Sequence, residues 1–233
     1  TAVFAVDVFC KKERLCHLHM KAAKEASAAL LAGEKNWLLQ LNFRFGRGEL
    51  PEGLVLCNRA GKPLCRECLA VSSGADTAPP ETGIAVTIHR NCLPFPNTVH
   101  VVPPSAVLGM GCRRGKEAAP VREAAEECLK EADIYKEALC AIASIDLKKE
   151  EPGILALSKD WRLPFQTFAE EELKAVKGEF TPSKFVEKIT GVDNVCERSA
   201  VLASGQGTLI RKKTGRDGVT TALAAGNRRI HFE

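Results

Sequence analysis

Leu108-Gly109-Met110-Gly111-Cys112-Arg113-Arg114-Gly115 is the stretch that decides the fold of the second half of the chain. The apolar residues 106–110 at its start have the pattern of a short buried strand. Residues 117–132 have the spacing of an amphipathic helix, which tolerates Pro120 because this residue falls in the first turn. The stretch is therefore predicted to connect a strand to a helix.

This connection has the chemistry of an anion-binding turn. Glycines let the backbone bend sharply and point its amide hydrogens outward, and the start of a helix carries a partial positive charge. Arginines add forked donors that match a carboxylate or a phosphate. The glycine spacing is neither that of a dinucleotide-binding loop nor that of a P-loop, and a plain tight turn with solvated arginines is the alternative. The predicted ligand-binding residues of the turn are Gly109, Gly111, Cys112, Arg113, Arg114 and Gly115.

Apolar runs and helical segments alternate after the Pro103-Pro104 pair, which cannot continue a strand ladder. This alternation favours a layered structure. We therefore predict a mixed α/β protein, with a small α+β domain at residues 1–104 and a three-layer α/β domain at residues 105–233. In the second domain, Thr181 or Ser183 can cap a helix. Helices are expected at 154–161, 169–176, 183–189 and 195–203 and strands at 208–211 and 219–224, while 139–145 is ambiguous.

The first domain is predicted to begin with an Ala- and Leu-rich helix at residues 21–31. Gly33 can take the left-handed conformation that ends such a helix. Short apolar runs separated by Gly, Pro and Asn then indicate the strands of a small sheet. These runs are residues 37–43, 53–57, 84–89 and 99–102, with loop composition at 72–83.

The composition narrows the class of protein. The chain has 233 residues, 45% of them hydrophobic, which is enough to bury a core. The net charge of +4 is too small for a nucleic-acid tract or a membrane-binding face. No apolar run reaches the roughly 20 residues that span a bilayer. We expect a cytoplasmic protein that binds neither nucleic acid nor membrane and holds any anion locally.

Ten cysteines are scattered along the chain, several of them in apolar stretches. This distribution is typical of reduced, partly buried thiols in a reducing cell. Cys57 with Cys65 and Cys68 is the exception, because a Cys-x-x-Cys pair with a third cysteine nearby can hold zinc or a cluster. A fourth ligand is not nearby, so free structural thiols are the other reading and no metal ligand is assigned.

Several motifs, in order, resemble the C-terminal domain of the CbiG and CobE family of cobalamin biosynthesis. The first is the glycine- and arginine-rich stretch quoted above. The second is residues 143–153, which resemble a Ser-x-x-x-Lys-x-x-Glu-x-Gly loop, and the third is Phe168 to Leu173, similar to a Phe-x-x-Glu-Glu-Leu helix start. Residues 191–200 then resemble a Gly-Val-x-x-Val-x-Glu segment, with Arg198 in place of an expected small residue, and residues 209–213 and 220–224 close the domain.

Residues 4–9 and the helix near 24–33 resemble the join between the N-terminal and central regions of CbiG. CobE has only the C-terminal domain, so this extra stretch favours CbiG. The glycine-rich, His-containing N-terminal segment expected of the full-length family does not occur in this sequence. We therefore expect a chain that begins partway through the CbiG architecture, with a central-region-like domain followed by the C-terminal domain.

The resemblance implies hydrolysis of cobalt-precorrin-5A in the anaerobic route to cobalamin. In that reaction a δ-lactone opens and the extruded two-carbon bridge leaves as acetaldehyde, giving cobalt-precorrin-5B. The resemblance also implies a cobalt-corrin substrate, no cofactor beyond the cobalt that this substrate carries, and neighbouring pathway enzymes as protein partners.

Such a substrate is a flat macrocycle with acid side chains, so its site needs several separate anion contacts and an apolar face. Opening the lactone needs a base for water, for which Glu197 is the first candidate and Asp146 the second. Solvated helix faces and satisfied strand-end hydroxyls are the ordinary alternatives for these residue types. The further predicted substrate contacts are Ser144, Lys148, Lys212, Thr220 and Thr221.

Two other functions stay open from the sequence. One is a non-catalytic corrin-binding or carrier module, as CobE is expected to be. The other is a generic anion-binding α/β protein with a zinc ribbon around Cys65. Acetaldehyde release, tight binding without turnover, and stoichiometric zinc would favour the hydrolase, the carrier and the zinc protein, respectively.

Overall fold

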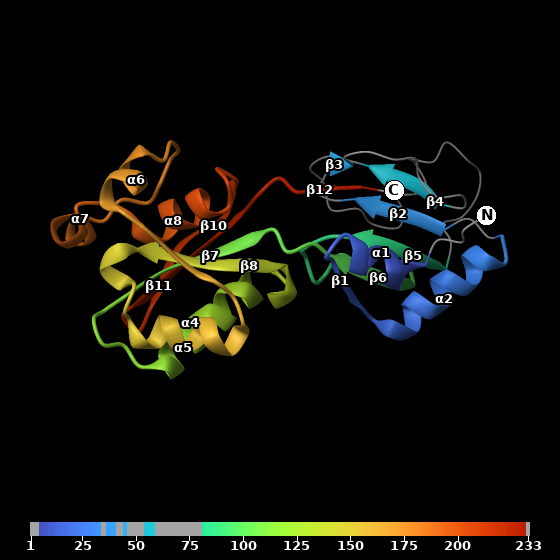
Figure 1. The fold of residues 1–233 in the computed structure, drawn as a ribbon, viewed down its shortest axis with the longest axis horizontal. Helices are drawn as coiled ribbons and strands as arrows, with labels where there is room; N and C mark the ends of the chain where they lie inside the picture. Colours follow the sequence, from blue (N-terminus) through green and yellow to red (C-terminus); the bar gives the residue numbers. More distant parts are fainter. Residues whose placement is uncertain (1–4, 34–35, 41–43, 46–53, 59–80, 232–233) are drawn as a thin grey trace. The chain divides into compact units, whose positions relative to one another are not determined.

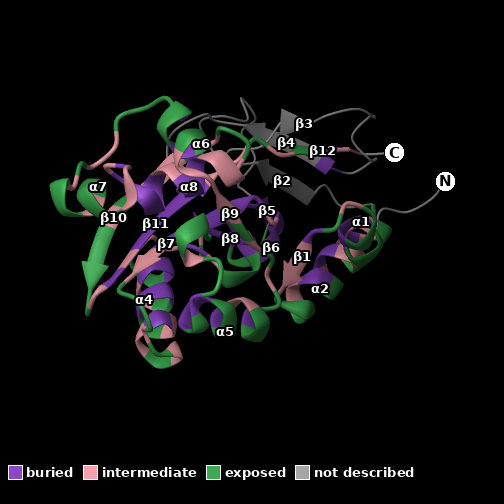
Figure 2. Ribbon diagram, turned by 60° about the vertical axis from the view of Figure 1, so that its left-hand side comes forward, coloured by how far each residue is buried: buried purple, intermediate pink, exposed green. Residues whose placement is uncertain are grey.

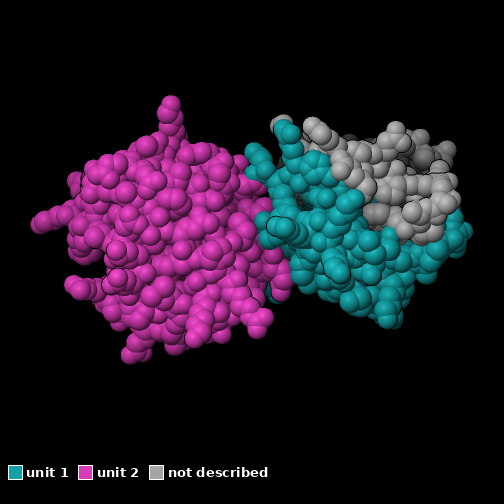
Figure 3. Space-filling view, viewed as in Figure 1, with its two compact units in different colours: residues 1–104, 227–233 teal, residues 105–226 magenta. Residues whose placement is uncertain are grey.

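The computed structural model describes residues 5–33, 36–40, 44–45, 54–58 and 81–231 (Figure 1). The chain divides into two compact units, residues 105–226 and residues 1–104 together with 227–233 (Figure 3). The second unit therefore ends earlier than the expected Glu233. Strand β12 (Arg229–Ile230) pairs with β3 (Arg44–Phe45), and the Arg228 guanidinium donates to the Pro104 and Glu13 carbonyls. These contacts bind the last residues to the first unit.

The first unit has a five-stranded sheet in the order β1-β6-β5-β2-β4. Four strands are parallel and β1 is antiparallel, so most of this small sheet has the parallel pairing that is typical of α/β domains. The predicted helix near 21–31 is confirmed, and Gly33 has φ 79°. The elements are α1 (Val6–Lys12), β1 (Cys16–Leu18), α2 (Met20–Leu31), β2 (Asn36–Gln40), β4 (Leu54–Asn58), β5 (Thr82–Val86) and β6 (Asn97–Val102).

Part of the first unit lies outside the described residues. The question of a metal at Cys57, Cys65 and Cys68 falls there, since only the backbone of Cys57, in β4, is described. The same holds for the predicted loop at 72–80 and for the end of the strand predicted at 37–43. Within the described part of the chain, no helix is long and apolar enough to cross a bilayer.

The second unit has a five-stranded sheet in the order β10-β11-β7-β8-β9. Strands β7, β8 and β9 are parallel, β11 pairs antiparallel with β7, and β10 pairs antiparallel with β11. Its strands are β7 (Ala106–Cys112), β8 (Leu139–Ile145), β9 (Phe165–Phe168), β10 (Thr208–Arg216) and β11 (Val219–Ala225). Its helices are α4 (Ala118–Glu131), α5 (Pro152–Trp161), α6 (Glu170–Ala175), α7 (Lys184–Thr190) and α8 (Val195–Ala203).

Helices cover both faces of this sheet, which confirms the three-layer α/β prediction (Figure 1). Helices α4 and α5 lie on one face, and α8 packs on the other against β7, β11 and β8. In Figure 2 the inner sides of α4 and α5 are buried and their outer sides exposed, as an amphipathic pattern requires. The ambiguous segment 139–145 is the strand β8. Its small side chains are buried because helices cover both faces of the central strands.

The glycine-rich stretch differs from its prediction. Strand β7 extends to Cys112, so Gly109 and Gly111 lie inside the strand and do not present loop amides. A Cβ atom on Gly109 would overlap the Cys196 carbonyl oxygen of α8, and one on Gly111 would lie 2.8 Å from the Thr220 hydroxyl. Gly109 is therefore needed for the close packing of α8 on β7, and Gly111 leaves room for the Thr220 side chain of the adjacent strand β11. Only residues 113–117 form the turn before α4.

Candidate functional site

The parallel strands β7, β8 and β9 all end at one edge of the sheet, at Cys112, Ile145 and Phe168. In open α/β sheets, ligands bind outside this carboxyl edge because loops and helix starts gather there. The β7–α4 turn, the 3₁₀ turn Asp146–Lys148 and the tip of the β10–β11 hairpin lie along it. We therefore take this carboxyl edge as the candidate site.

The Glu151 side chain joins the first two of these loops. One carboxylate oxygen accepts a hydrogen bond from the Lys116 backbone amide at 3.0 Å. The other accepts from the Lys148 ammonium at 2.9 Å. Glu151 is 5% exposed, so this ion pair is shielded from water. The amide hydrogens that were predicted to bind a substrate carboxylate are thus partly occupied by a carboxylate of the protein itself.

The electrostatics of this cluster favour a charged Glu151. Burial alone would raise the pKa of Glu151, but the hydrogen bonds from Lys148 and from the Lys116 and Gly115 amides hold it below its ordinary value. The neighbouring Cys112 thiol behaves differently. Burial raises its pKa to about 11, although Lys148 and Lys116 lower it and Glu151 raises it further. Cys112 is therefore a neutral thiol at physiological pH, beside a fixed ion pair.

The Ser-x-x-x-Lys-x-x-Glu-x-Gly segment consists largely of structural contacts to the glycine-rich stretch. Ser144, its first residue, is fully buried and donates to the Met110 carbonyl at 2.7 Å. Gly153, its last, lies against the turn, because a Cβ atom there would be 2.5 Å from the Lys116 carbonyl oxygen. The two motifs therefore pack against each other and connect β7 and β8 to the starts of α4 and α5.

The hairpin tip contacts the same turn from the other side. The Arg113 amide donates to the Gly218 carbonyl at 3.0 Å, and the Arg113 side chain lies along Gly218. The Lys116 ammonium pairs with Asp217 at 2.9 Å. Arg113 and Arg114 are exposed, so their charges are free to meet a ligand in solution.

Thr220 and Thr221, which were predicted as substrate contacts, lie in β11 within the sheet. Thr221 is buried on the α4 side beside Cys128 and lies 3.3 Å from the Thr214 hydroxyl. Thr220 is half-buried, faces Cys196 of α8 and donates to the Gly111 carbonyl. Hydroxyls on strands often satisfy backbone groups in this way.

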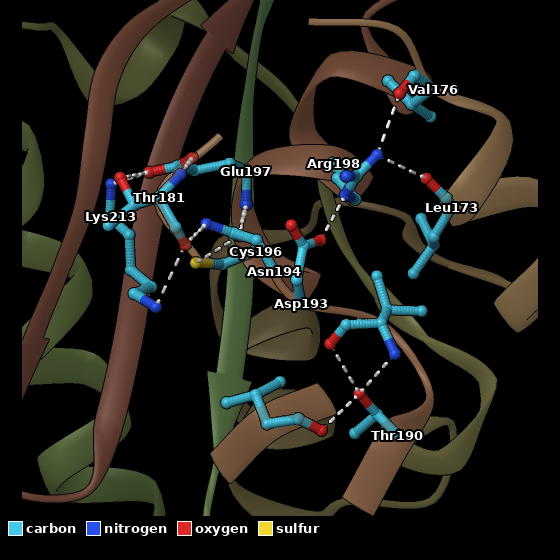
Figure 4. A network of polar contacts seen from close by, with 12 residues as sticks. Leu173, Val176, Thr181, Thr190, Asp193, Asn194, Cys196, Glu197, Arg198 and Lys213 are labelled. Carbon is cyan, nitrogen blue, oxygen red and sulfur yellow. Dashed lines mark hydrogen bonds and ion pairs between the residues drawn. The ribbon is translucent and has the colours of Figure 1, made fainter. Parts of the chain in front are cut away.

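Glu197, the first candidate for the base, lies in the interior of the second unit (Figure 4). It is fully buried, and its carboxylate accepts hydrogen bonds from the Thr181 amide and hydroxyl, each at 2.8 Å, and from the Lys213 amide at 2.5 Å. Asn194 caps the same helix and also donates to the Thr181 carbonyl. With three donors and no exposed surface, Glu197 anchors the segment before α7 to β10.

Arg198, unexpected at its position, has a packing role (Figure 4). Its guanidinium pairs with Asp193 at 2.8 Å and donates to the Leu173 and Val176 carbonyls at the end of α6. It also lies 4.5 Å from the centre of the Phe180 ring. A forked donor suits carbonyls pointing from several directions, so the arginine holds α6 against α8.

Asp146 lies in a different environment at the same edge. It is exposed and lines a hollow of about 600 Å³. The hollow lies between the end of β8, the start of α6 and the last turn of α7. The hollow also contains the exposed apolar side chain of Leu147. The charged residues lining it are Asp146, Lys149, Glu150, Glu170 and Glu171. The carboxyl edge thus has an acidic part at the hollow and a basic part at the β7–α4 turn.

The structure therefore brings together five of the predicted residues and separates the others. Cys112, Arg113, Arg114, Gly115 and Lys148 lie around one turn, with Asp146 on the neighbouring loop. Lys212 is exposed in the middle of β10, the sheet's edge strand. Sequence reasoning missed Glu151, Lys116 and Asp217, although Glu151 stands in the quoted loop motif. Among the described residues, no cluster of His, Cys, Asp or Glu is arranged to hold a metal ion.

Comparisons with known proteins point to one pathway. The family described as "Cobalamin synthesis G C-terminus" matches residues 106–224. A cobalt-precorrin-5A hydrolase of Salmonella typhimurium is 36% identical over 140 residues, which cover 59% of this chain and 40% of that protein. The protein CobE of Sinorhizobium sp is 34% identical over 120 residues, covering 51% and 78%. The crystal structure of a CobE from the cobalamin (vitamin B12) biosynthetic pathway has 32% identity and a TM-score of 0.49, covering 53% of this chain and 92% of that one.

Proposed function

This chain belongs to the cobalamin synthesis G C-terminal family, and from this premise we propose that it acts on cobalt-precorrin-5A in the anaerobic route to cobalamin. The aligned part of the chain spans 40% of the length of its Salmonella typhimurium relative, so the activity of the whole relative is itself part of the proposal. In the proposed reaction one water adds to the δ-lactone carbonyl and the acyl carbon–oxygen bond breaks, which gives a carboxylate and a hydroxyl group on the two-carbon bridge. This hydroxyl group loses its proton and becomes the carbonyl of acetaldehyde as the carbon–carbon bond to the macrocycle breaks. The electron pair of that bond stays on the macrocycle, which takes up a proton.

The observation that carries the proposal is the exposed basic part of the carboxyl edge. Arg113 and Arg114 project from the β7–α4 turn beside Lys148, which is 17% exposed in its side chain and held by Glu151. Acid side chains around a corrin ring need several separate cations, and arginines bind them with paired hydrogen bonds. Leu147, 67% exposed at the adjacent loop, offers an apolar contact for the flat ring.

Asp146 is the better candidate for the base that activates water. Its side chain is exposed on the loop next to Lys148, whereas Glu197 is buried and accepts three hydrogen bonds. A general base must reach both water and substrate, and the exposure of the Asp146 side chain supports this role. The acid groups of the substrate would contact the arginine turn, and the lactone would lie over the acidic part of the edge.

A binding module without turnover is the second candidate. One observation favours it: the matched region covers 78% of the Sinorhizobium CobE but only 40% of the Salmonella typhimurium hydrolase. In this case the basic edge would hold a corrin precursor, and a reacting group would come from another polypeptide segment.

Incubation of the protein with cobalt-precorrin-5A under anaerobic conditions, with acetaldehyde trapped as a hydrazone, tests the proposal. We expect stoichiometric acetaldehyde from the wild-type chain and a loss of at least about 100-fold in rate for Asp146→Asn, the scale of a general base. Acetaldehyde formation that Asp146→Asn leaves unchanged would exclude this base. Saturable binding without acetaldehyde would favour the carrier, and neither binding nor release would reject both functions.

A further inference from the structure

We propose that Glu151 is a positioning residue that fixes Lys148 and the β7–α4 turn as one carboxylate-binding surface. The inference rests on the proposed function, because it names how the same site recognises the acid groups of its ligand. Glu151 itself is 5% exposed and does not contact a ligand in solution. It acts through the groups that it holds.

The contacts of Glu151 determine where two positive groups stand. Lys148 extends from the loop after β8, and its flexible side chain would sweep a wide volume if unpaired. The 2.9 Å contact with Glu151 holds its ammonium beside the end of β7 and leaves its other hydrogens available. The 3.0 Å bond from the Lys116 amide holds the turn that carries Arg113 and Arg114.

Simple electrostatics would predict the opposite role. Glu151 carries a negative charge next to a site for polyanions, so on charge alone its removal should tighten binding. If its function is to position Lys148 and the turn, its removal should weaken binding, because the cations lose their fixed geometry. The two effects differ in sign, which makes a charge-matched experiment decisive.

Glu150 provides the matched control. It is the adjacent residue and is exposed at the hollow; no hydrogen bond or ion pair of its side chain is found among the described contacts. Glu150→Gln and Glu151→Gln each change the net charge by the same amount and keep nearly the same side-chain shape. Only Glu151→Gln removes the ion pair with Lys148, and it leaves one acceptor oxygen where Glu151 uses two. Glu151→Asp keeps the charge and tests partial rescue.

The first measurement is amide hydrogen exchange of the unliganded full chain. We expect the Gly115 and Lys116 amides to exchange at least about tenfold faster in Glu151→Gln than in the wild type, with β7 unchanged, because opening free energies are local. Glu150→Gln should match the wild type. Equal exchange at these amides in Glu151→Gln would overturn the proposed positioning.

The second measurement is binding of two stable probes: cobyrinic acid, a cobalt corrin with free peripheral acids, and cobinamide, in which these acids are amides. For cobyrinic acid we expect Glu151→Gln to raise Kd at least about tenfold, Glu151→Asp to recover part of the loss, and Glu150→Gln to leave Kd equal or lower. Cobinamide affinity should respond to none of them. Tighter cobyrinic acid binding by Glu151→Gln would overturn the inference. No binding of cobyrinic acid by the wild type would contradict the proposed function instead. Amide exchange would still show whether Glu151 holds the β7–α4 turn.

Discussion

Gly109 of β7 lies directly under the Cys196 carbonyl of α8, so close that a Cβ atom at Gly109 would overlap this oxygen. The helix can therefore approach the strand without any side chain between them. Gly109→Ala should destabilise the protein by about 3 kcal/mol or more, because the helix must move away from a well-packed sheet. Urea unfolding followed by circular dichroism measures this loss.

Gly215 is the control for this prediction. It is exposed near the end of β10, and its Cβ position has only ordinary contacts, the nearest atom at 3.7 Å. Gly215→Ala should change the free energy of unfolding by no more than about 0.5 kcal/mol. Equal effects of the two substitutions would mean that the close approach of α8 is not what Gly109 provides.

Glu197 should matter for stability. Glu197→Ala leaves the Thr181 amide and hydroxyl and the Lys213 amide without their buried acceptor, at an expected cost of about 3 kcal/mol. Glu179→Ala, an exposed change in the adjoining segment, should be nearly neutral. If Glu197→Gln kept full stability but lost acetaldehyde release, Glu197 would be the base after all.

Arg113 should contribute to ligand affinity without supporting the fold. Its side chain is exposed along Gly218, so Arg113→Ala should weaken cobyrinic acid binding by about 1.5 to 3 kcal/mol, the range for a lost charged hydrogen bond. Lys159→Ala removes the same charge from the last turn of α5, at the far end of the helix from the carboxyl edge. Isothermal titration should show little change for this control, and an equal loss for both variants would indicate a diffuse charge effect.

Acid should weaken the contacts of Glu151 with Lys148 and the Lys116 amide. The pKa of Glu151 is lower in the folded protein than in the unfolded chain, because the Lys148 and amide hydrogen bonds outweigh its burial. The unfolded state therefore binds the proton more readily. The stabilisation is complete above the unfolded-state pKa and is lost as the pH falls through the folded-state pKa.

The free energy of unfolding, measured from about pH 7 to about pH 3, checks this expectation. The free energy of unfolding of Glu151→Gln should fall less steeply over the acid part of the range than that of the wild type. In Glu150→Gln the contribution of Glu151 to the slope of the free energy of unfolding against pH should be the same as in the wild type. Parallel curves for the wild type and Glu151→Gln would contradict the lowered pKa.

Local patterns predicted most of the second unit. The amphipathic spacing of 117–132 and the Ser183 cap depend only on residues close in sequence. The Ser183 hydroxyl accepts a hydrogen bond from the Val186 amide, as a helix cap does. Strand β9 was missed, because four residues with no fully buried side chain carry too short a pattern. Gly111 was placed outside the predicted strand 106–110, and Gly109 inside it was taken as a ligand-binding residue, since a glycine required for packing and one required for turning look alike in sequence.

The candidate site depended more on contacts between distant residues. Lys116 and Glu151 are 35 positions apart, and Thr181 and Glu197 are 16 apart. The sequence left open whether Glu197 is a base among apolar neighbours or an exposed carboxylate on a helix, and neither alternative revealed the donors that surround it. Arg113 and Arg114 could be selected from charge and turn chemistry alone, because they follow a predicted strand, whereas Lys148 follows a segment that was ambiguous and was selected with the family's loop motif.

The central claim is that the carboxyl edge of the β7–β8–β9 sheet binds a carboxylate-rich corrin. A titration of isotope-labelled protein with cobyrinic acid, followed by nuclear magnetic resonance, tests where binding occurs. We predict chemical-shift changes concentrated at residues 112–116 and 146–149 and reduced by Arg113→Ala. Changes confined to the opposite edge, near the start of β7 and the end of α5, would contradict the account.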